Sequence, residues 1–345
     1  MAFYLASPTP FFLASPSSTL PTNKLTISTS CSGIINPNHL KFKLNVVKNR
    51  ASGGRTTGKV EENSCGHDLF GGKLVQGKLI FQQNFLIKSY ELGPDSKISI
   101  GALINLLQES ALNHFISAGL VAEGFGSTPA MCLKNLIWVV YKMQIVVDSY
   151  PSWSDVVQVD TWTCASGRYG VRRDWLGRDY KTGKTLFRAV RLARKEEIVY
   201  VMMNKKTRKL SKFIEETREE TKAVFMECDP IIIDDGRKLR DLDFDTADYV
   251  ITDLSPNWTD LDVNQHVNHV KYIKWILESA PDSILETQKL CALKLEFRKE
   301  CGKNSLVQSL SAISREAEGI ELEHTLRLQN GARILRGRTL WMPRN

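Results

Sequence analysis

Long apolar runs, paired cysteines and the common nucleotide-binding and serine-hydrolase motifs are all missing from this 345-residue sequence. The strongest apolar run starts at Leu136 and is broken at Lys142, short of the ~18 residues that a membrane span needs. The seven cysteines include no CxxC pair, which argues against a disulfide framework or a cysteine-rich zinc site and favours a reducing compartment. Walker A, GxSxG and GxGxxG patterns are absent. We therefore expect no membrane span, no metal and no cofactor.

Acidic residues are absent from the first sixty positions, which carry seven Lys+Arg and fifteen Ser+Thr. This composition is typical of an organelle transit peptide, although a disordered segment without targeting meaning would look similar. Residues 61–345 hold 39 Lys+Arg against 38 Asp+Glu, so the net charge of +8 belongs almost entirely to the first segment. A nucleic-acid binder would need a larger local excess of positive charge. We predict a transit peptide over 1–60, a linker over 61–78 and no nucleic-acid partner.

Two segments have helical periodicity, and each is followed by a strand-like run. Apolar residues recur at three- and four-residue spacing from Ile100 to Phe115, with Ser99 available as a cap, and again from Val263 to Leu277. Residues rich in β-branched and aromatic side chains follow each segment, with turn signals between them. The order helix then strands, twice, predicts an α+β fold in which each helix packs on an antiparallel sheet.

A shift of 150 residues places residues 143–158 over 293–308 without a gap and matches apolar to apolar positions. The helices show a fainter echo, LLQESA against WILESA. One such alignment can arise by chance, so the internal repeat stays a hypothesis at this point. Residues 215–245 hold eleven acids against five bases and include Pro230 and Gly236, which predicts an exposed acidic linker. The predicted halves are then 79–214 and 246–345.

The densest polar cluster lies where the second helix is expected to begin. Asp262, Asn264 and His266 stand at alternate positions, so an extended or irregular lead-in would project them in one direction. In one interpretation, Asp262 or Asn264 caps the helix, Asn268 does likewise, and the histidines lie on the surface. In the other, the three form a catalytic set, in which the histidine moves a proton and the asparagine donates to an oxyanion.

A second candidate is the pair Glu300 and Cys301. The 150-residue shift places them over Tyr150 and Pro151, so only the second half carries an acid and a thiol there. Cys301 together with a histidine and an asparagine would suit a thiol nucleophile. Glu300 could equally act as a base toward water, with Cys301 on the opposite face of the strand. These residue patterns do not choose between the two, and no third ligand accompanies the histidines for a metal.

At these residues the sequence resembles a known family. WTDLDVNQHVNHVKYIKWILESAP and LEFRKECGKNSLVQSL are similar to the two active-site blocks of plant acyl-acyl-carrier-protein thioesterases. The resemblance extends from about Leu79 to the C-terminus and is closer to the B class, which prefers saturated acyl chains. It implies a tandem hot-dog fold and a chloroplast enzyme that hydrolyses the thioester between a fatty acyl chain and acyl carrier protein (ACP). ACP is the implied partner, and a homodimer is kept as a hypothesis.

The resemblance also implies roles for residues. The family pattern falls on Asp262, Asn264, His266, Glu300 and Cys301. We assign Glu300 as the base, and His266 and Asn264 as the orienting and oxyanion groups. Asp262 is assigned as the partner that positions them, and Cys301 has no definite role. The first half is expected to bind the acyl chain, with candidate lining residues Leu103, Leu107, Phe115, Met131 and Trp138, although a core role would need the same residue types. Candidates for docking the acidic ACP are Arg172, Arg173, Lys205, Lys206, Arg208, Lys209 and Lys212.

Three departures from the family pattern keep other functions open. Extra residues between about 190 and 200 predict a loop, a damaged domain or an imperfect gene model. The tryptophan-containing linker usual in the B class is missing before Leu79, and His269 stands where the family generally has asparagine. A catalytically poor acyl or ACP binder, and a hot-dog hydrolase or dehydratase acting on acyl-CoA, are the alternatives.

Overall fold

The computed structural model describes residues 71–122, 125–166, 170–193, 202–315 and 319–344. The predicted transit peptide 1–60 lies outside these ranges, as do residues 194–200 of the insertion predicted at about 190–200, whereas residues 190–193 belong to strand β7 (Thr185–Ala193). The predicted linker 61–78 is wrong for its last residues, because Gly72–Val75 form strand β1 and pair with β2 (Ile80–Leu86). No helix in the described ranges is long and apolar enough to cross a membrane.

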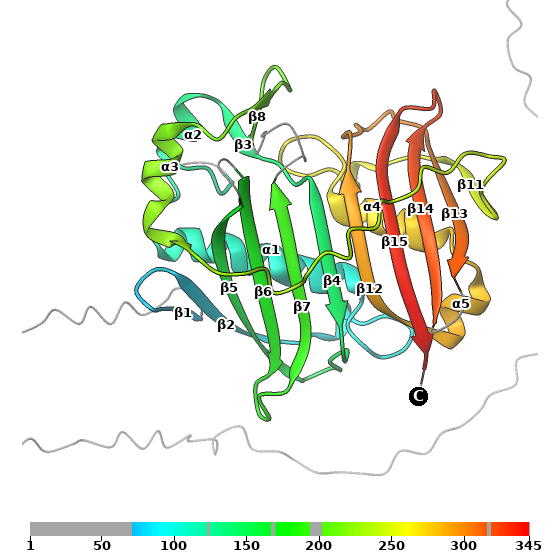
Figure 1. The fold of residues 1–345 in the computed structure, drawn as a ribbon, viewed down its shortest axis with the longest axis horizontal. Helices are drawn as coiled ribbons and strands as arrows, with labels where there is room; N and C mark the ends of the chain where they lie inside the picture. The colour runs from blue at the N-terminus through cyan, green and yellow to red at the C-terminus, as the bar shows by residue number, and fades with distance from the viewer. Residues whose placement is uncertain (1–70, 123–124, 167–169, 194–201, 316–318, 345) are drawn as a thin grey trace, which may run out of the picture. The chain divides into compact units, whose positions relative to one another are not determined.

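A single large sheet dominates the described residues. Its twelve strands run in the order β1-β2-β5-β6-β7-β4-β12-β15-β14-β13-β11, and β10 pairs with β5 (Figure 1). The first half supplies β4 (Lys142–Val147), β5 (Val156–Ser166), β6 (Gly170–Asp179) and β7 (Thr185–Ala193). The second half supplies β11 (Tyr249–Leu254), β12 (Gln288–Phe297), β13 (Val307–Arg315), β14 (Ile320–Leu328) and β15 (Arg333–Pro343).

Smaller elements lie at the ends and on the faces of this sheet. A separate three-stranded sheet contains β3 (Leu136–Trp138), β8 (Met202–Asn204) and β9 (Leu210–Ser211). The remaining short elements are η1 (Ser89–Glu91), α2 (Pro129–Leu133), α3 (Glu215–Thr221), η2 (Lys222–Val224), β10 (Phe225–Met226), η3 (Trp258–Asp260) and α5 (Asp282–Thr287).

Two helices cover one face of the large sheet (Figure 1). Helix α1 (Ile100–Ser117) begins where the Ser99 side chain accepts a hydrogen bond from Ala102 N at 3.2 Å, so the first predicted helix and its cap are confirmed. Helix α4 (His269–Glu278) begins later than predicted, and Asn268 caps it. The lead-in is not helical because Gln265 has a φ of 63°, in the left-handed region.

The core lies between these helices and the sheet. Trp175 and Trp275 are both buried there, and the Trp175 indole donates to Ser110 Oγ at 3.1 Å. Each large apolar side chain buried in this layer contributes about 1.5–3 kcal/mol. Two histidines are also buried: His114 donates Nε2–H to Lys78 O, and His324 contacts Thr339 Oγ1. Burial lowers the pKa of both imidazoles to about 3, so they are neutral in the folded protein.

The two halves are related by a local two-fold axis at the β4–β12 contact. Ile145 pairs with Leu293 and Met143 with Leu295, and the 150-residue shift equates 143 with 293 and 145 with 295. Met143 therefore pairs with the equivalent of Ile145, and Ile145 pairs with the equivalent of Met143, which is the reciprocity that a two-fold axis between duplicated strands produces. The predicted α+β fold, a tandem hot-dog with two helix-on-antiparallel-sheet repeats, is confirmed.

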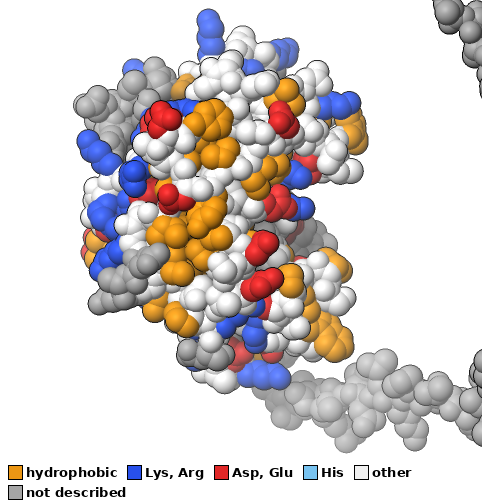
Figure 2. Space-filling view, turned by 90° about the vertical axis from the view of Figure 1, so that its right-hand side faces the viewer, with side chains coloured by type: hydrophobic (Ala, Val, Ile, Leu, Met, Phe, Trp, Pro, Cys, Tyr) orange, Lys and Arg blue, Asp and Glu red, His pale blue; other side chains and the backbone are white. Residues whose placement is uncertain are grey.

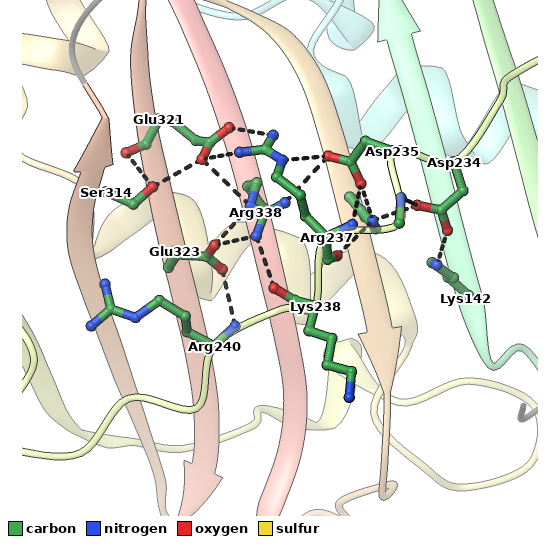
Figure 3. A network of polar contacts seen from close by, with 12 residues as sticks. Lys142, Asp234, Asp235, Arg237, Lys238, Arg240, Ser314, Glu321, Glu323 and Arg338 are labelled. Atoms are coloured by element: carbon green, nitrogen blue, oxygen red, sulfur yellow. Dashed lines mark hydrogen bonds and ion pairs between the residues drawn. The ribbon is translucent and has the colours of Figure 1, made fainter.

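Most residues of the segment between the halves are exposed, as the sequence predicts, but the segment is also attached to the sheet. It crosses the sheet on the face opposite the helices (Figure 1), and ion pairs fasten it to four strands (Figure 3). Lys294 Nζ donates to Asp234 and Asp235 at 2.6 and 2.7 Å, and Arg237 makes two bonds to Glu321. Burial opposes ionisation of Asp235, but hydrogen bonds from Lys294 and Arg237 outweigh it and lower its pKa. Acidic side chains of the segment thus form ion pairs with basic side chains on the sheet.

Candidate active site

The loop before α4 is organised by one carboxylate. Asp262 Oδ1 accepts hydrogen bonds from the backbone N–H groups of Asn264 (2.8 Å) and His266 (3.1 Å). Asp262 N donates to His266 O at 2.7 Å, which closes the loop on itself. Asp262 is therefore not a helix cap, and the predicted irregular lead-in is what the chain adopts. The loop places the side chains of Asp262, Asn264 and His266 at the wall of one cavity.

The His266 ring has a fixed orientation. Its Nδ1 lies 2.8 Å from the Asn264 carbonyl oxygen. A carbonyl oxygen only accepts, so Nδ1 carries the proton and donates it. Nε2 is left facing Glu300, with 3.5 Å between Nε2 and Glu300 Oε1. That separation exceeds a good direct hydrogen bond, so the imidazole and the carboxylate lie side by side at the cavity wall.

Glu300 is held by an arginine that the sequence analysis assigned to ACP docking. Arg208 donates Nε–H to Glu300 Oε1 at 2.7 Å, and its Nη2 contacts Oε2. Arg208 belongs to the turn between β8 and β9 and has a φ of 55°, a conformation that non-glycine residues seldom adopt. Its docking assignment is wrong because its side chain lines the cavity. The sequence did not reveal this role, because Arg208 stands among lysines and looks like one more residue of a basic cluster. Its left-handed backbone conformation cannot be recognised from the spacing of residues.

Cys301 lies on the other side of the same chain segment and is buried, with 3% of its surface exposed. Its backbone N–H donates to the Tyr272 hydroxyl at 3.0 Å, and its Sγ lies 3.4 Å from that oxygen. Burial raises the pKa of the Cys301 thiol, and the neighbouring Glu300 carboxylate raises it further. Glu300 faces the cavity, whereas Cys301 does not line it. A buried, protonated thiol is a poor nucleophile.

The cavity has a volume of about 430 Å³ and a largely apolar wall beside the polar cluster. Phe115 from α1 and Trp138 from β3 line it, as do Ala111 and Leu112. Three of the predicted lining residues do not. Leu103 and Leu107 are fully buried in the core between α1 and the sheet, because they lie on another face of the helix. Met131 packs in a separate cluster with Leu136, Met202 and Phe213.

Two cavity-lining arginines make part of the wall positively charged. Arg173 on β6 and Arg191 on β7 are cross-strand partners. Burial lowers the pKa of Arg173 to about 9 and of Arg191 to about 10, and the two charges also repel. Arg173 donates to His114 Nδ1 at 3.1 Å. His269 lines the same cavity; burial chiefly, and Arg191 secondarily, lower its pKa to about 3, so it is neutral.

The arginine pair predicted for docking is not available at the surface. Arg173 faces the cavity, and Arg172 is 5% exposed and paired with Asp174 at 3.0 Å. Their assignment as docking residues is wrong, because strand residues of the sheet are covered on both faces here. The remaining docking candidates, Lys205, Lys206, Lys209 and Lys212, are exposed. They flank Arg208, which reaches the cavity from the same hairpin.

The first half contains the same loop without the chemistry. Gly93 N donates to Lys97 O at 2.7 Å, as Asp262 N does to His266 O, and Ser96 has the left-handed conformation of Gln265. By this correspondence Gly93, Asp95 and Lys97 stand in for Asp262, Asn264 and His266.

The same symmetry applies to the second cluster. Ile98 N donates to Pro151 O at 2.9 Å, and Val267 N donates to Cys301 O at 3.0 Å. Pro151 and Tyr150 therefore replace Cys301 and Glu300, as the 150-residue shift predicts. Between the two loops, only that of the second half carries the polar set.

Comparisons with known proteins agree with this geometry. The family description "Acyl-ACP thioesterase N-terminal domain" matches residues 78–221, and "Acyl-ACP thioesterase C-terminal domain" matches residues 244–343. The chain is 55% identical over 282 residues to a chloroplastic palmitoyl-acyl carrier protein thioesterase of Arabidopsis thaliana, covering 79% of this chain and 67% of that protein.

Solved structures give the same answer. A 12:0-ACP thioesterase from Umbellularia californica is 42% identical with a TM-score of 0.71, covering 77% of this chain and 94% of that one. A putative oleoyl thioesterase from Lactobacillus plantarum, 20% identical, has a TM-score of 0.63, covers 77% and 97% of the two chains and is similar in fold alone. The chain belongs to the acyl-ACP thioesterase family.

Proposed function

We propose that this protein hydrolyses the thioester of acyl-ACP, which releases a free fatty acid and ACP and ends chain elongation in the chloroplast stroma. The observation that carries the proposal is the cavity that brings Glu300, His266 and Asn264 together beside an apolar wall. Chloroplastic location is supported by the names of relatives such as the Arabidopsis thaliana protein and by the acid-free, Ser/Thr-rich first sixty residues.

Glu300 is the general base of this mechanism. A water in the cavity donates one hydrogen to Glu300 and is oriented by the neighbouring His266, so that a lone pair of its oxygen faces the thioester carbonyl carbon. Glu300 takes one proton as the oxygen attacks, and it returns that proton to the departing pantetheine sulfur. The Asn264 amide donates to the oxyanion of the tetrahedral intermediate. Arg208 and Asp262 are positioning residues that hold Glu300 and the loop.

The acyl chain is proposed to lie against the apolar wall, beside Phe115 and Trp138. We propose a preference for long saturated chains of the palmitoyl class. Support comes from the higher identity to the palmitoyl thioesterase (55%) than to the 12:0 enzyme (42%). Turnover of 12:0-, 16:0- and 18:1-ACP under matched conditions tests this preference; fastest release from 12:0-ACP would contradict it.

ACP is proposed to dock on Lys205, Lys206, Lys209 and Lys212. These lysines are exposed and lie on the hairpin whose Arg208 enters the cavity, so an acidic partner there would place its prosthetic group near Glu300. A homodimer stays a hypothesis. It is supported by the edge strand β11, whose Val250 is 39% exposed, and by the apolar side chains gathered on the face seen in Figure 2. Light scattering of the full-length chain tests it.

Two single substitutions separate the water mechanism from a thiol mechanism. General-base catalysis contributes about 10²- to 10⁴-fold, so Glu300→Gln should lower kcat on 16:0-ACP by that factor. Cys301→Ser should retain kcat within about tenfold and mainly lower Tm, because Cys301 packs against Tyr272. The opposite ranking would assign the chemistry to Cys301. No fatty acid release by the wild-type chain from any acyl-ACP or acyl-CoA would favour a binding function.

A further inference from the structure

Two cysteines outside the active site lie almost within bonding distance. Cys164 is on β5 and Cys228 follows β10 in the segment that connects the halves. Their Sγ atoms are 2.8 Å apart. A disulfide bond is about 2.05 Å long, so a movement of under about 1 Å would join them. The sequence, which has seven cysteines and no CxxC pair, gives no sign of this approach.

The backbone holds the two cysteines in this relation. Strand β10 runs parallel to β5, with Phe225 opposite Thr163 and Met226 opposite Cys164. The next turn of chain brings Cys228 over β5. Cys164 is 1% exposed, whereas Cys228 is at the surface. A solvent-borne disulfide can therefore reach Cys228 first, and Cys164 is sheltered until Cys228 has reacted.

A guanidinium positions the outer sulfur. Arg172 is the cross-strand partner of Cys164 and donates Nη2–H to Cys228 O at 2.7 Å and to Cys228 Sγ at 3.2 Å. These two hydrogen bonds hold the Cys228 sulfur beside Cys164. Arg172 Nε also occupies both carboxylate oxygens of Asp174. That pairing leaves Asp174 poorly available as the third ligand of a metal held by the two cysteines.

We propose that Cys164 and Cys228 are a reversible disulfide site that fastens the connecting segment to β5. The oxidant is a low-molecular-weight disulfide such as oxidised glutathione. The Cys228 thiolate attacks one sulfur of that disulfide and expels one glutathione thiolate, forming a mixed disulfide. Cys164 then loses its proton and attacks Cys228 Sγ, expelling the second glutathione thiolate. The two cysteines lose two protons and two electrons in total, which the oxidised glutathione takes up to give two molecules of reduced glutathione.

The bond would close a loop across 64 positions of the chain. A loop of that size restricts the unfolded chain strongly, so the oxidised protein should have a Tm higher by about 5 °C or more. The bond lies on the face of β5 opposite to Thr163, which lines the cavity. This proposal does not rest on the catalytic activity and is tested without an acyl-ACP assay.

The test uses the full-length chain in mixtures of reduced and oxidised glutathione. Intact mass spectrometry should show the loss of two hydrogens, reversed by dithiothreitol, and peptide mapping should place the bond between the Cys164 and Cys228 peptides. Cys164→Ser and Cys228→Ser should each abolish that bond and the rise in Tm. Cys132→Ser and Cys291→Ser are matched controls, because these two cysteines take no part in the proposed bond and should leave both results unchanged.

Three results would overturn the proposal. The first is that differential alkylation of the wild-type chain finds Cys164 and Cys228 both free at every ratio of the two glutathiones. The second is that they form separate mixed disulfides instead of a bond to each other. The third is that the reduced chain, given zinc alone, binds one zinc per chain and loses it in the Cys228→Ser variant, which would make the cluster a metal site.

Discussion

The carboxylate of Asp262 should act on catalysis through the shape of its loop. Replacing Asp262 with Ala removes the acceptor for two backbone N–H groups, at 2.8 and 3.1 Å. Hydrogen bonds to a charged group are worth about 1.5–3 kcal/mol each when buried. The loop is only half-buried, so hydrogen bonds to water replace part of this stabilisation. We therefore expect the ordered loop to lose about 2 kcal/mol of stability in total. Asn keeps an oxygen acceptor without the charge and should lose about 1 kcal/mol.

These energies translate into populations of the ordered loop. A loss of about 2 kcal/mol lowers the population of the catalytic conformation by up to about 30-fold, and about 1 kcal/mol by about fivefold. The displaced loop carries His266, whose Nδ1 is anchored to Asn264 O in the same turn. We expect kcat to fall about 30-fold in Asp262→Ala and about fivefold in Asp262→Asn. KM should change little, because the apolar wall that includes Phe115 lies elsewhere.

The assay is steady-state turnover of 16:0-ACP, with Tm measured on the same samples. Asp95→Ala is the matched control: Asp95 Oδ1 accepts from Lys97 N at 3.1 Å in the equivalent loop of the first half, which has no catalytic histidine. That variant should lose a little stability and keep kcat within about twofold. Wild-type kcat in Asp262→Ala would refute the positioning role. Equal inactivity of the Asn and Ala variants would instead give the Asp262 carboxylate a direct part in proton transfer.

Two further predictions follow from other contacts. Arg208→Met should lower kcat at least tenfold, because Arg208 fixes both oxygens of Glu300. The control Lys209→Met should raise KM for acyl-ACP in a salt-dependent way and leave kcat unchanged. Equal kcat for the two variants would show that Arg208 has no role in the active site. Burial holds the folded-state pKa far below the unfolded value of about 6.5 for His114, His269 and His324. Their contribution to stability is complete above pH 6.5 and is lost as pH falls toward about 3, by up to about 1.4 kcal/mol per pH unit for each histidine. Urea unfolding from pH 8 to pH 5 measures this slope, and His324→Phe should reduce it by one proton; an unchanged slope would mean that His324 is already protonated in the fold.

The order of elements was readable because it depends on local periodicity. The three- and four-residue spacing from Ile100, with Ser99 before it, predicts α1 and its cap, and both are present. The same spacing misplaced the start of α4, because Val263 fits an apolar helical pattern while Gln265 adopts a left-handed conformation. That conformation is stabilised by Asp262, through hydrogen bonds that a periodicity cannot report. The alternation of Asp262, Asn264 and His266 was the better guide to this loop.

Assignments that depend on exposure failed most often. In the sequence, Arg172 and Arg173 look like a basic surface patch. In the structure, however, β6 is an inner strand of the sheet. The connecting segment covers Arg172, and Arg173 lines the cavity. Residues 234–237 are exposed as predicted, yet they form ion pairs with Lys142, Lys294 and Glu321 on the sheet, which the sequence does not predict. Charge counts along a chain do not report which opposite charges will face them after folding.

The sequence by itself determined the two helix-on-sheet units and the half that carries the polar residues, and it indicated the duplication as a hypothesis, because these depend on apolar spacing and on the residue types at equivalent positions. Only the tertiary structure decided that Glu300 faces the cavity while Cys301 is buried against Tyr272, and that Arg208 joins Glu300 across 92 positions of chain. It also brought Cys164 to Cys228. The physical reason is that strand facing, burial and the approach of distant segments are set by how the sheet and its covering segments pack, which local composition does not contain.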